Sequence, residues 1–314
     1  MARFVVISDT HFRVPGSVTE DKTFWNRVLR TRIGEVGECL IETINVIGPD
    51  FVVHCGDITG LCEMRNWDFA CSLLDRLDCP WFAVLGNHDT WFPGLREAFS
   101  ARFARASDRC YYRRDLLGMR FLFLDTVHWY TREGSISPYL DKELYDRGEI
   151  AGMGPSDEQL AWLSDQLARS QGWPVALVNH SPLGYRSVYP VSTMPKGQPS
   201  DTGRTSLENY FGPVMRRSEM RETIRCYGNV RVVFAGHWHI FDKVTQDGVV
   251  HCQTGSLREY PFEIRVVEVG RNRLEVETVP LLSGGFQAAS LIPEWHNEWI
   301  AGSASDRTFS VPLS

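Results

Sequence analysis

The stretch Phe51-Val-Val-His-Cys-Gly-Asp-Ile-Thr59 joins a short apolar run to an acidic side chain. The run from Phe51 to Val53 has the length and β-branched character of a buried strand, and Asp57 follows it after a short polar turn. The same order, an apolar run and then a polar side chain, returns several times along the chain. Open α/β sheets collect ligands at the carboxyl ends of their strands, so this repetition predicts such a sheet with a site at one edge.

Further apolar runs of strand length end in polar or glycine-rich turns, at 4–7, 81–85, 121–124, 175–178 and 230–235. Helices are expected between several of them, at 22–47 with an interruption near Gly34 and Gly37, and at 64–77, 95–104 and 157–168. Ser156 and Gln159 form a capping-box pattern ahead of the last of these helices. Two long segments without a clear pattern, 127–155 and 181–204, are candidate rims of a site.

The pattern changes after Ala235. Asp247-Gly248 predicts a two-residue hairpin turn, and the runs 264–269 and 274–279 are expected to extend the same antiparallel sheet. Alternating strands and helices followed by hairpins predict a layered α/β or α+β sandwich.

The composition is that of a folded protein, with 43% apolar residues and ten Trp. The net charge of -6 gives no long-range attraction to nucleic acid or to an anionic membrane, so a small substrate is favoured over a long polyanion. No apolar run approaches the roughly 20 residues that span a bilayer, and no signal-peptide core precedes the first strand, so we expect a cytoplasmic protein. The eight cysteines contain no CxxC pair, which favours reduced, mostly buried thiols.

Residues of the types that commonly bind metals follow the predicted strands. They are Asp9, His11, Asp57, Asn87, His180, His237 and His239. Carboxylates, imidazoles and an amide without thiolates suit manganese, iron or zinc. If strand geometry continues past each run, Asp9 and His11 point the same way, and so do His237 and His239. The lone carboxylate of Asp57 could bridge two ions about 3.5–4 Å apart.

Other polar residues near these positions have more than one interpretation. Asp89 could orient an imidazole or cap the following helix. His54 and Asn179 would point to the opposite face of their strands, so packing or support of the ligands is their expected role.

The motifs Asp9-x-His11, Gly56-Asp57, Gly86-Asn-His-Asp89, His180 and Gly236-His-x-His239 resemble those of the calcineurin-like metallophosphoesterase superfamily. The resemblance implies a four-layer α/β (α+β) sandwich of two packed mixed β-sheets flanked by helices. It also implies two divalent metal ions (manganese, iron or zinc), the first bound by Asp9, His11 and His239, the second by Asn87, His180 and His237. Asp57 would bridge both ions, and His88 would be the catalytic histidine near the leaving group.

Residues 124–126 and 154–163 are similar to class III cyclic-nucleotide phosphodiesterases, although a strand, a loop and a helix could recur there for packing reasons alone. Protein Ser/Thr phosphatases continue the Gly-Asp motif as Asp-Arg-Gly, and purple acid phosphatases place a metal-binding Tyr where this chain has Gly60. Both families are therefore disfavoured.

The expected reaction is hydrolysis of small phosphodiesters, with 3′,5′-cyclic nucleotides as the leading guess, by in-line attack of a metal-bound hydroxide. The alternatives are a phosphomonoesterase, a nuclease and a non-catalytic metal-binding scaffold. Arg13, Tyr185 and Arg204 are candidate substrate contacts in the loops.

Residues 1–280 are expected to form the catalytic domain. Residues 281–314 would be an extension that caps the site, packs on the sheet or joins an interface. Whether the protein is a homo-oligomer is left open.

Overall fold

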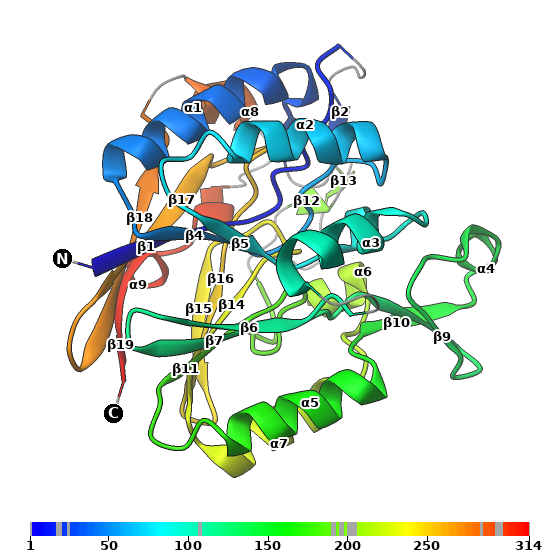
Figure 1. Cartoon of the computed structure of the whole chain (residues 1–314). Coiled ribbons are helices and arrows are strands. Elements are labelled where there is room, and N and C mark those ends of the chain that lie inside the picture. The colour runs from blue at the N-terminus through cyan, green and yellow to red at the C-terminus, as the bar shows by residue number, and fades with distance from the viewer. Residues whose placement is uncertain are drawn as a thin grey trace.

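Two six-stranded mixed sheets form the middle of the molecule (Figure 1). The computed structural model describes residues 2–16, 21–23, 26–105, 109–189, 193–194, 198–199, 206–282, 285–292 and 298–313. The first sheet has the order β19-β18-β17-β1-β4-β5, with β1 (Ala2–Ile7), β4 (Phe51–His54), β5 (Trp81–Ala83), β17 (Glu263–Val269), β18 (Arg273–Pro280) and β19 (Thr308–Pro312). The second has the order β15-β16-β14-β11-β7-β6, with β6 (Tyr112–Leu116), β7 (Met119–Phe123), β11 (Val175–Val178), β14 (Val230–Ala235), β15 (Asp242–Gln246) and β16 (Val249–Gln253).

Helices cover the outer face of each sheet. Figure 1 shows α1 (Ile33–Ile47) and α2 (Met64–Leu74) above the first sheet, and α5 (Asp157–Ala168) and α7 (Arg217–Tyr227) below the second. The layers therefore run helix, sheet, sheet, helix, which confirms the predicted sandwich.

The core between the two sheets is aromatic. Phe4 of β1 stacks on Phe51 at 5.0 Å and meets Phe121 and Phe234 of the second sheet edge-on at 5.4 and 5.8 Å. These side chains are at most 2% exposed. Edge-to-face contacts of this kind favour one relative placement of the two sheets.

The C-terminal strands differ from the prediction. The turn at Asp247-Gly248 forms as expected between β15 and β16, but β16 is parallel to β14, and β17 and β18 belong to the first sheet. β17 pairs antiparallel with β1, where Val5 faces Val266. The expectation that 264–269 and 274–279 extend the hairpin sheet was therefore wrong, because local turn signals define hairpins and not the long-range neighbour of each hairpin.

The expected helix at 22–47 is shorter than predicted and unbroken. β2 (Asp21–Thr23) and β3 (Asn26–Val28) form a hairpin, and α1 begins only at Ile33 and continues through both glycines. A side chain at Gly37 would place its Cβ 2.9 Å from Cδ1 of Leu73. This glycine therefore permits close packing of α1 on α2, and it does not mark an interruption.

The other predicted helices are confirmed, the one at 157–168 with the predicted ends and the one at 64–77 with an earlier end, at Leu74. The first five residues of 95–104 form α3 (Leu95–Phe99), and the chain continues as a π-helical turn, η3 (Ser100–Ala104). At α5, Ser156 Oγ accepts a hydrogen bond from Gln159 N at 3.3 Å, which is half of the predicted capping box. The side chain of Gln159 bonds elsewhere.

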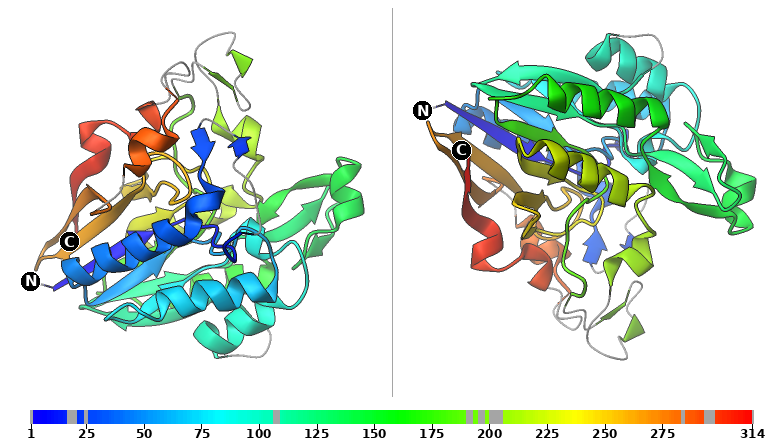
Figure 2. Two further views of the ribbon diagram at one scale, coloured as in Figure 1. Left: turned by 90° about the horizontal axis from the view of Figure 1, so that it is seen from above. Right: turned by 90° about the horizontal axis from the view of Figure 1, so that it is seen from below.

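Residues 127–155 are not irregular. They contain β8 (His128–Thr131), β9 (Ile136–Ser137), α4 (Lys142–Asp146) and β10 (Ile150–Gly154), and the strands form a sheet of order β10-β8-β9. Figure 2 shows this arm projecting from the sandwich. Of segment 181–204, the structure describes 181–189 and the short pair β12 (Thr193–Met194) and β13 (Gln198–Pro199).

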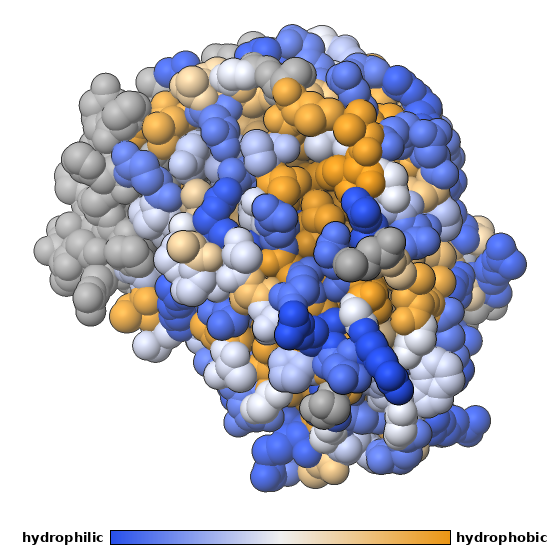
Figure 3. Space-filling view, turned by 90° about the vertical axis from the view of Figure 1, so that its left-hand side faces the viewer, coloured by the Kyte–Doolittle hydropathy of each residue, from blue (hydrophilic) through white to orange (hydrophobic). Residues whose placement is uncertain are grey.

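The last part of the chain returns to the sandwich. It contains α8 (Phe286–Ser290), the 3-10 turn η6 (Glu298–Ala301), α9 (Ala304–Arg307) and β19, which pairs antiparallel with β18. Figure 3 shows the side of the molecule that is on the left in Figure 1, where apolar side chains gather in the upper half among hydrophilic ones. Among the described residues, no helix has the length and apolar character that crossing a bilayer requires.

Candidate metal centre

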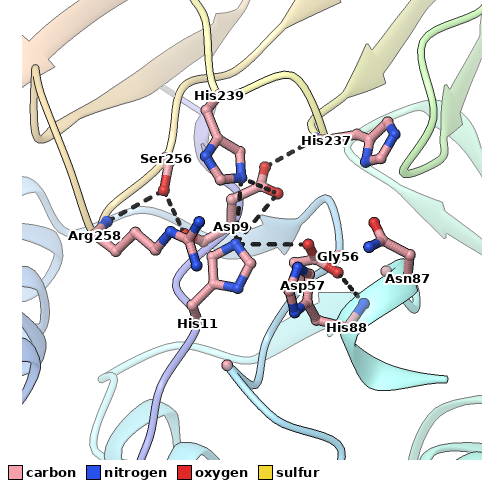
Figure 4. Close-up of polar contacts among 12 residues, drawn as sticks. Asp9, His11, Gly56, Asp57, Asn87, His88, His237, His239, Ser256 and Arg258 are labelled. Atoms are coloured by element: carbon pink, nitrogen blue, oxygen red, sulfur yellow. Dashed lines mark hydrogen bonds and ion pairs between the residues drawn. The ribbon is translucent and has the colours of Figure 1, made fainter. Parts of the chain in front are cut away.

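The predicted metal ligands come together where the carboxyl ends of strands from both sheets meet (Figure 4). The first sheet supplies the side chains that follow β1, β4 and β5, which are Asp9, His11, Asp57 and Asn87. The second sheet supplies those that follow β11 and β14, which are His180, His237 and His239. Neither sheet alone could form this site.

Four buried side chains form its tightest part. One possible ligand atom from each of Asp9, His11, Asp57 and His239 lies within 4.8 Å of the others. His239 Nε2 is 3.2 Å from Asp9 Oδ1 and 3.3 Å from His11 Nε2. Two imidazole nitrogens and two carboxylates that converge in this way could hold one divalent ion.

The backbone at these residues is left-handed and not extended. Asp9, His11, Asp57, His237 and His239 have φ of 50°, 46°, 53°, 70° and 57°. The side chains therefore reach the centre from sharp turns, and the explanation by alternation along a continued strand was wrong. Backbone bonds from Asp9 N to Gly56 O and from His11 N to Asp57 O, both 3.0 Å, hold two of these turns together. Strained backbone of this kind is common at functional sites.

Asp57 lies between the two groups of predicted ligands. Its Oδ2 atom is 3.5 Å from His11 Nε2, and its Oδ1 atom is 3.5 Å from His180 Nε2. His180 Nε2 is also 3.1 Å from Asn87 Oδ1, and the rings of His180 and His237 are 4.9 Å apart. One carboxylate oxygen thus faces each half of the centre.

The electrostatics of the centre suit a cation. Burial raises the pKa of Asp57 well above its usual value, and the nearby carboxylates of Asp9 and Asp89 add to this effect. Burial opposes protonation of His239, yet Asp9 and Glu259 outweigh it and raise the pKa of this ring. Closely spaced buried carboxylates are stabilised by a metal ion, so the residues present fit the group that the motifs imply.

His88 stands at the more open side of the centre. It is half-buried, and its ring lies 4.8 Å from that of His11 and 4.4 Å from that of Trp91. Burial, reinforced by Arg258, lowers the pKa of His88 well below its usual value. A neutral imidazole that reaches the surface beside the cluster can exchange a proton or donate a hydrogen bond.

Asp89 connects two loops. Its Oδ1 atom accepts hydrogen bonds from N and Oγ1 of Thr59 at 2.9 and 2.8 Å, and its Oδ2 atom accepts from Gly86 N at 2.9 Å and Ile58 N at 3.1 Å. The carboxylate thereby fixes the turn that carries Asp57 to the turn that carries Asn87. These contacts are structural, and they place Asp89 behind the centre.

His54 and Asn179 also support the loops. His54 Nδ1 accepts a hydrogen bond from Gly56 N at 3.2 Å, and its Nε2 lies 3.0 Å from Thr10 Oγ1. Asn179 Nδ2 donates to the backbone oxygen of Ser181. Both side chains therefore hold the backbone beside ligands.

The candidate substrate contacts have different surroundings. Arg13 is 7% exposed, and its Nη2 donates to Gly60 O at 2.5 Å. Tyr185 packs on Trp238 with ring centroids 4.5 Å apart, under the guanidinium of Arg217 at 3.9 Å. Arg204 lies outside the described residues. Substrate contact by these residues stays a prediction.

The segments that resemble class III phosphodiesterases have a packing explanation. Asp125 follows β7 as the ligands follow their strands, but its carboxylate pairs with the buried guanidinium of Arg96. Gln159 of α5 donates to Asp125 O at 2.7 Å and accepts from Asp125 N at 2.5 Å. This pair of hydrogen bonds between strand end and helix explains why the two segments occur together.

The sequence interpretation missed the loop between β16 and β17. Ser256, Arg258 and Glu259 of this loop lie beside Asp9, His11 and His239 (Figure 4). Ser256 and Arg258 are at most 2% exposed, and so is Glu259. These residues stand in no recognisable motif, and only their proximity in space identifies them.

Comparisons with known proteins agree with this geometry. The model of the family described as calcineurin-like phosphoesterase matches residues 2–241. A probable cyclic nucleotide phosphodiesterase of Fibrobacter succinogenes is 22% identical over 192 residues, which cover 60% of this chain and 57% of that protein. The match thus spans little more than half the length of this curated relative.

Solved structures share the fold. A dimetal phosphatase from Danio rerio has a TM-score of 0.66 at 16% identity, with 92% of this chain and 98% of that chain covered. The purple acid phosphatase PPD1 from yellow lupin seeds has a TM-score of 0.53 at 16% identity, with 90% of this chain and 52% of that chain covered. At such identities the likeness shows the architecture, two mixed sheets flanked by helices.

Proposed function

Because the chain belongs to the calcineurin-like phosphoesterase family, we propose that it hydrolyses small phosphodiesters with the help of two divalent metal ions. Asp9, His11 and His239 would bind one ion, Asn87, His180 and His237 the other, and Asp57 both. Manganese, iron and zinc all suit these ligands.

The position of Asp57 is the observation that carries the proposal. Each of its two oxygens faces the imidazole of a different ligand group, at 3.5 Å in both cases. A buried carboxylate with one oxygen toward each half is what a bridge between two ions requires. When bound, the two ions would supply a nucleophile at neutral pH and neutralise charge on the phosphoryl oxygens.

His88 would serve the leaving group. Its ring is held between His11 and Trp91, and its backbone N donates to Asp57 Oδ1 at 2.8 Å, so the bridging carboxylate positions the backbone that carries it. A neutral imidazole in this place could donate a hydrogen bond to the phosphoryl group or pass a proton to the departing alkoxide.

The preference for diesters rests on the relative from Fibrobacter succinogenes, a probable cyclic nucleotide phosphodiesterase, and 3′,5′-cyclic nucleotides are therefore the first substrates to test. The net charge of -6 argues against long nucleic acids. A phosphomonoesterase is the nearest alternative.

The test is turnover by metal-reconstituted protein of a bis-aryl phosphodiester, an aryl phosphomonoester and cyclic nucleotides. We expect the diester to be the better substrate, and Asp57→Asn or His237→Ala to abolish metal-dependent turnover while the protein stays folded. A variant that lacks metal yet retains wild-type turnover would contradict the proposal. Faster turnover of the monoester would agree with the proposed metal centre but would contradict the proposed preference for diesters.

A further inference from the structure

We propose that Glu259 strengthens ion binding at the half of the metal centre formed by Asp9, His11 and His239. Its charge adds to the inequality that Asp9, opposite the neutral Asn87, already gives the two halves. This inference rests on the ligand groups of the proposed function. It concerns a positioning residue in the β16–β17 loop, which comprises residues 254–262.

The contact between Glu259 and His239 carries the inference. Glu259 Oε1 accepts a hydrogen bond from His239 Nδ1, and both side chains are buried. With the proton on Nδ1, the opposite nitrogen of His239 presents its lone pair to the cluster, 3.2 Å from Asp9 Oδ1. A carboxylate partner also raises the basicity of an imidazole ligand, which strengthens its bond to a metal ion.

In the other half, a backbone carbonyl takes the place that the carboxylate of Glu259 has beside His239. His180 Nδ1 lies 2.8 Å from the backbone oxygen of Cys55, a neutral acceptor. The ring of His237 lies between those of His180 and Phe211, with centroids 4.9 and 5.3 Å away. A carbonyl fixes the tautomer of His180 as well as a carboxylate would, but it adds no negative charge. The hydrogen-bond partners of His239 and His180 therefore differ in charge, in the same direction as the ligands Asp9 and Asn87.

The β16–β17 loop is attached to the same half of the centre. Ser256 Oγ donates to Asp9 O at 2.9 Å, and Leu257 N donates to the same oxygen at 3.2 Å. Arg258 O accepts from Leu29 N at 2.9 Å. Figure 4 shows Ser256 and Arg258 on the side of Asp9 and His11, away from Asn87. These bonds fix the loop, so Glu259 meets His239 in a preset position.

Metal titration of Glu259→Gln tests the inference. Protein freed of metal with a chelator is titrated with Mn²⁺ or Zn²⁺ by calorimetry, and bound metal is counted after dialysis. We expect wild-type protein to bind two ions with different dissociation constants. In the variant the tighter constant should weaken about 10- to 100-fold, the range found for loss of such partners, while the weaker one stays nearly unchanged.

Glu263→Gln is the matched control. Glu263 is also buried and lies four positions further along the chain, but it pairs with Arg307 and not with a proposed ligand. The control should lose some stability and keep both dissociation constants. Thermal unfolding of both variants separates a general loss of stability from a specific loss of metal affinity.

Two results would overturn the inference. One is unchanged metal binding in Glu259→Gln. The other is an equal weakening of both sites in proportion to lost stability, as a purely structural role would give. A wild-type protein that binds no metal would instead contradict the proposed function and the inference together, whereas two-ion binding with no effect of Glu259 would leave the function standing.

Discussion

Gly86→Ala should disable the centre through one methyl group. Gly86 precedes Asn87, and an ideal Cβ there would lie 2.1 Å from both N and Oδ1 of Asp57. Ordinary van der Waals contact begins near 3.4 Å, so the new methyl carbon and these two atoms of Asp57 must move apart by about 1.3 Å. Asp57 O and Oδ1 accept hydrogen bonds from His11 N and His88 N, so both the backbone and the carboxylate of Asp57 have to move by about 1 Å against these bonds.

The expected size of the effect follows from this displacement. A misplacement of about 1 Å in a catalytic arrangement costs about 100-fold in rate, and overpacking of a buried site costs about 1–3 kcal/mol in the free energy of unfolding. We therefore expect kcat/KM for the bis-aryl phosphodiester to fall at least about 100-fold, with reduced metal content. The variant should remain folded at room temperature.

Gly148→Ala is the control. Gly148 follows α4 in the projecting arm with φ of 70°, and no atom lies within 4 Å of the position that a Cβ would take there. Alanine in this left-handed conformation costs roughly 1–2 kcal/mol, so the control loses similar stability without touching the centre. Wild-type turnover and metal content in Gly86→Ala would refute the reasoning, and so would an equal loss of turnover in the control.

Three further changes test other parts of the structure. His88→Asn should reduce turnover of diesters with poor alkoxide leaving groups by about 100- to 10,000-fold and that of nitrophenyl esters much less, and equal losses for both would argue against a role at the leaving group. Asp89→Asn should lower the free energy of unfolding by about 1–3 kcal/mol, measured by urea denaturation, because its amide group cannot accept all the bonds from Gly86, Ile58 and Thr59. Burial, reinforced by Arg221, lowers the pKa of His251 to about 4 from the usual 6.5. Between pH 4 and pH 6.5 this ring is therefore protonated in the unfolded chain and neutral in the folded protein. Burial of this ring therefore costs no stability above pH 6.5, and the free energy of unfolding falls by about 3 kcal/mol as the pH drops to 4. His251→Gln should flatten this pH profile of stability. An unchanged profile would contradict the assignment.

The sequence predicted which residues converge at the centre because their motifs are local. Asp9, Asp57 and His180 each follow an apolar run closely in the sequence, and the end of such a run is visible without a structure. The backbone conformation was not predictable in the same way. The turn at Asp9 depends on a hydrogen bond to Gly56 O, far along the sequence, and no local pattern reports that bond.

Long-range pairing explains the remaining differences. β17 and β18 were recognised as strands, but β17 pairs with β1 and β18 pairs with β17, and the first of these pairings joins residues far apart in the sequence, such as Val5 and Val266. Glu259 was missed for a related reason. A lone glutamate after an arginine has no functional signature, and it becomes informative only when the structure places its carboxylate on His239.

The two proposed ions would each connect the two sheets. The first would be bound by Asp9 and His11 from one sheet and His239 from the other, and the second by Asn87 from one and His180 from the other. The aromatic core around Phe4 fixes the same interface from within. Left-handed backbone at several of these ligands costs free energy, on the order of 1 kcal/mol for each, and binding energy at a shared ion would offset it. Ion binding would therefore be coupled to packing of the sheets, since the side chains that would bind a single ion come from opposite sides of the sandwich.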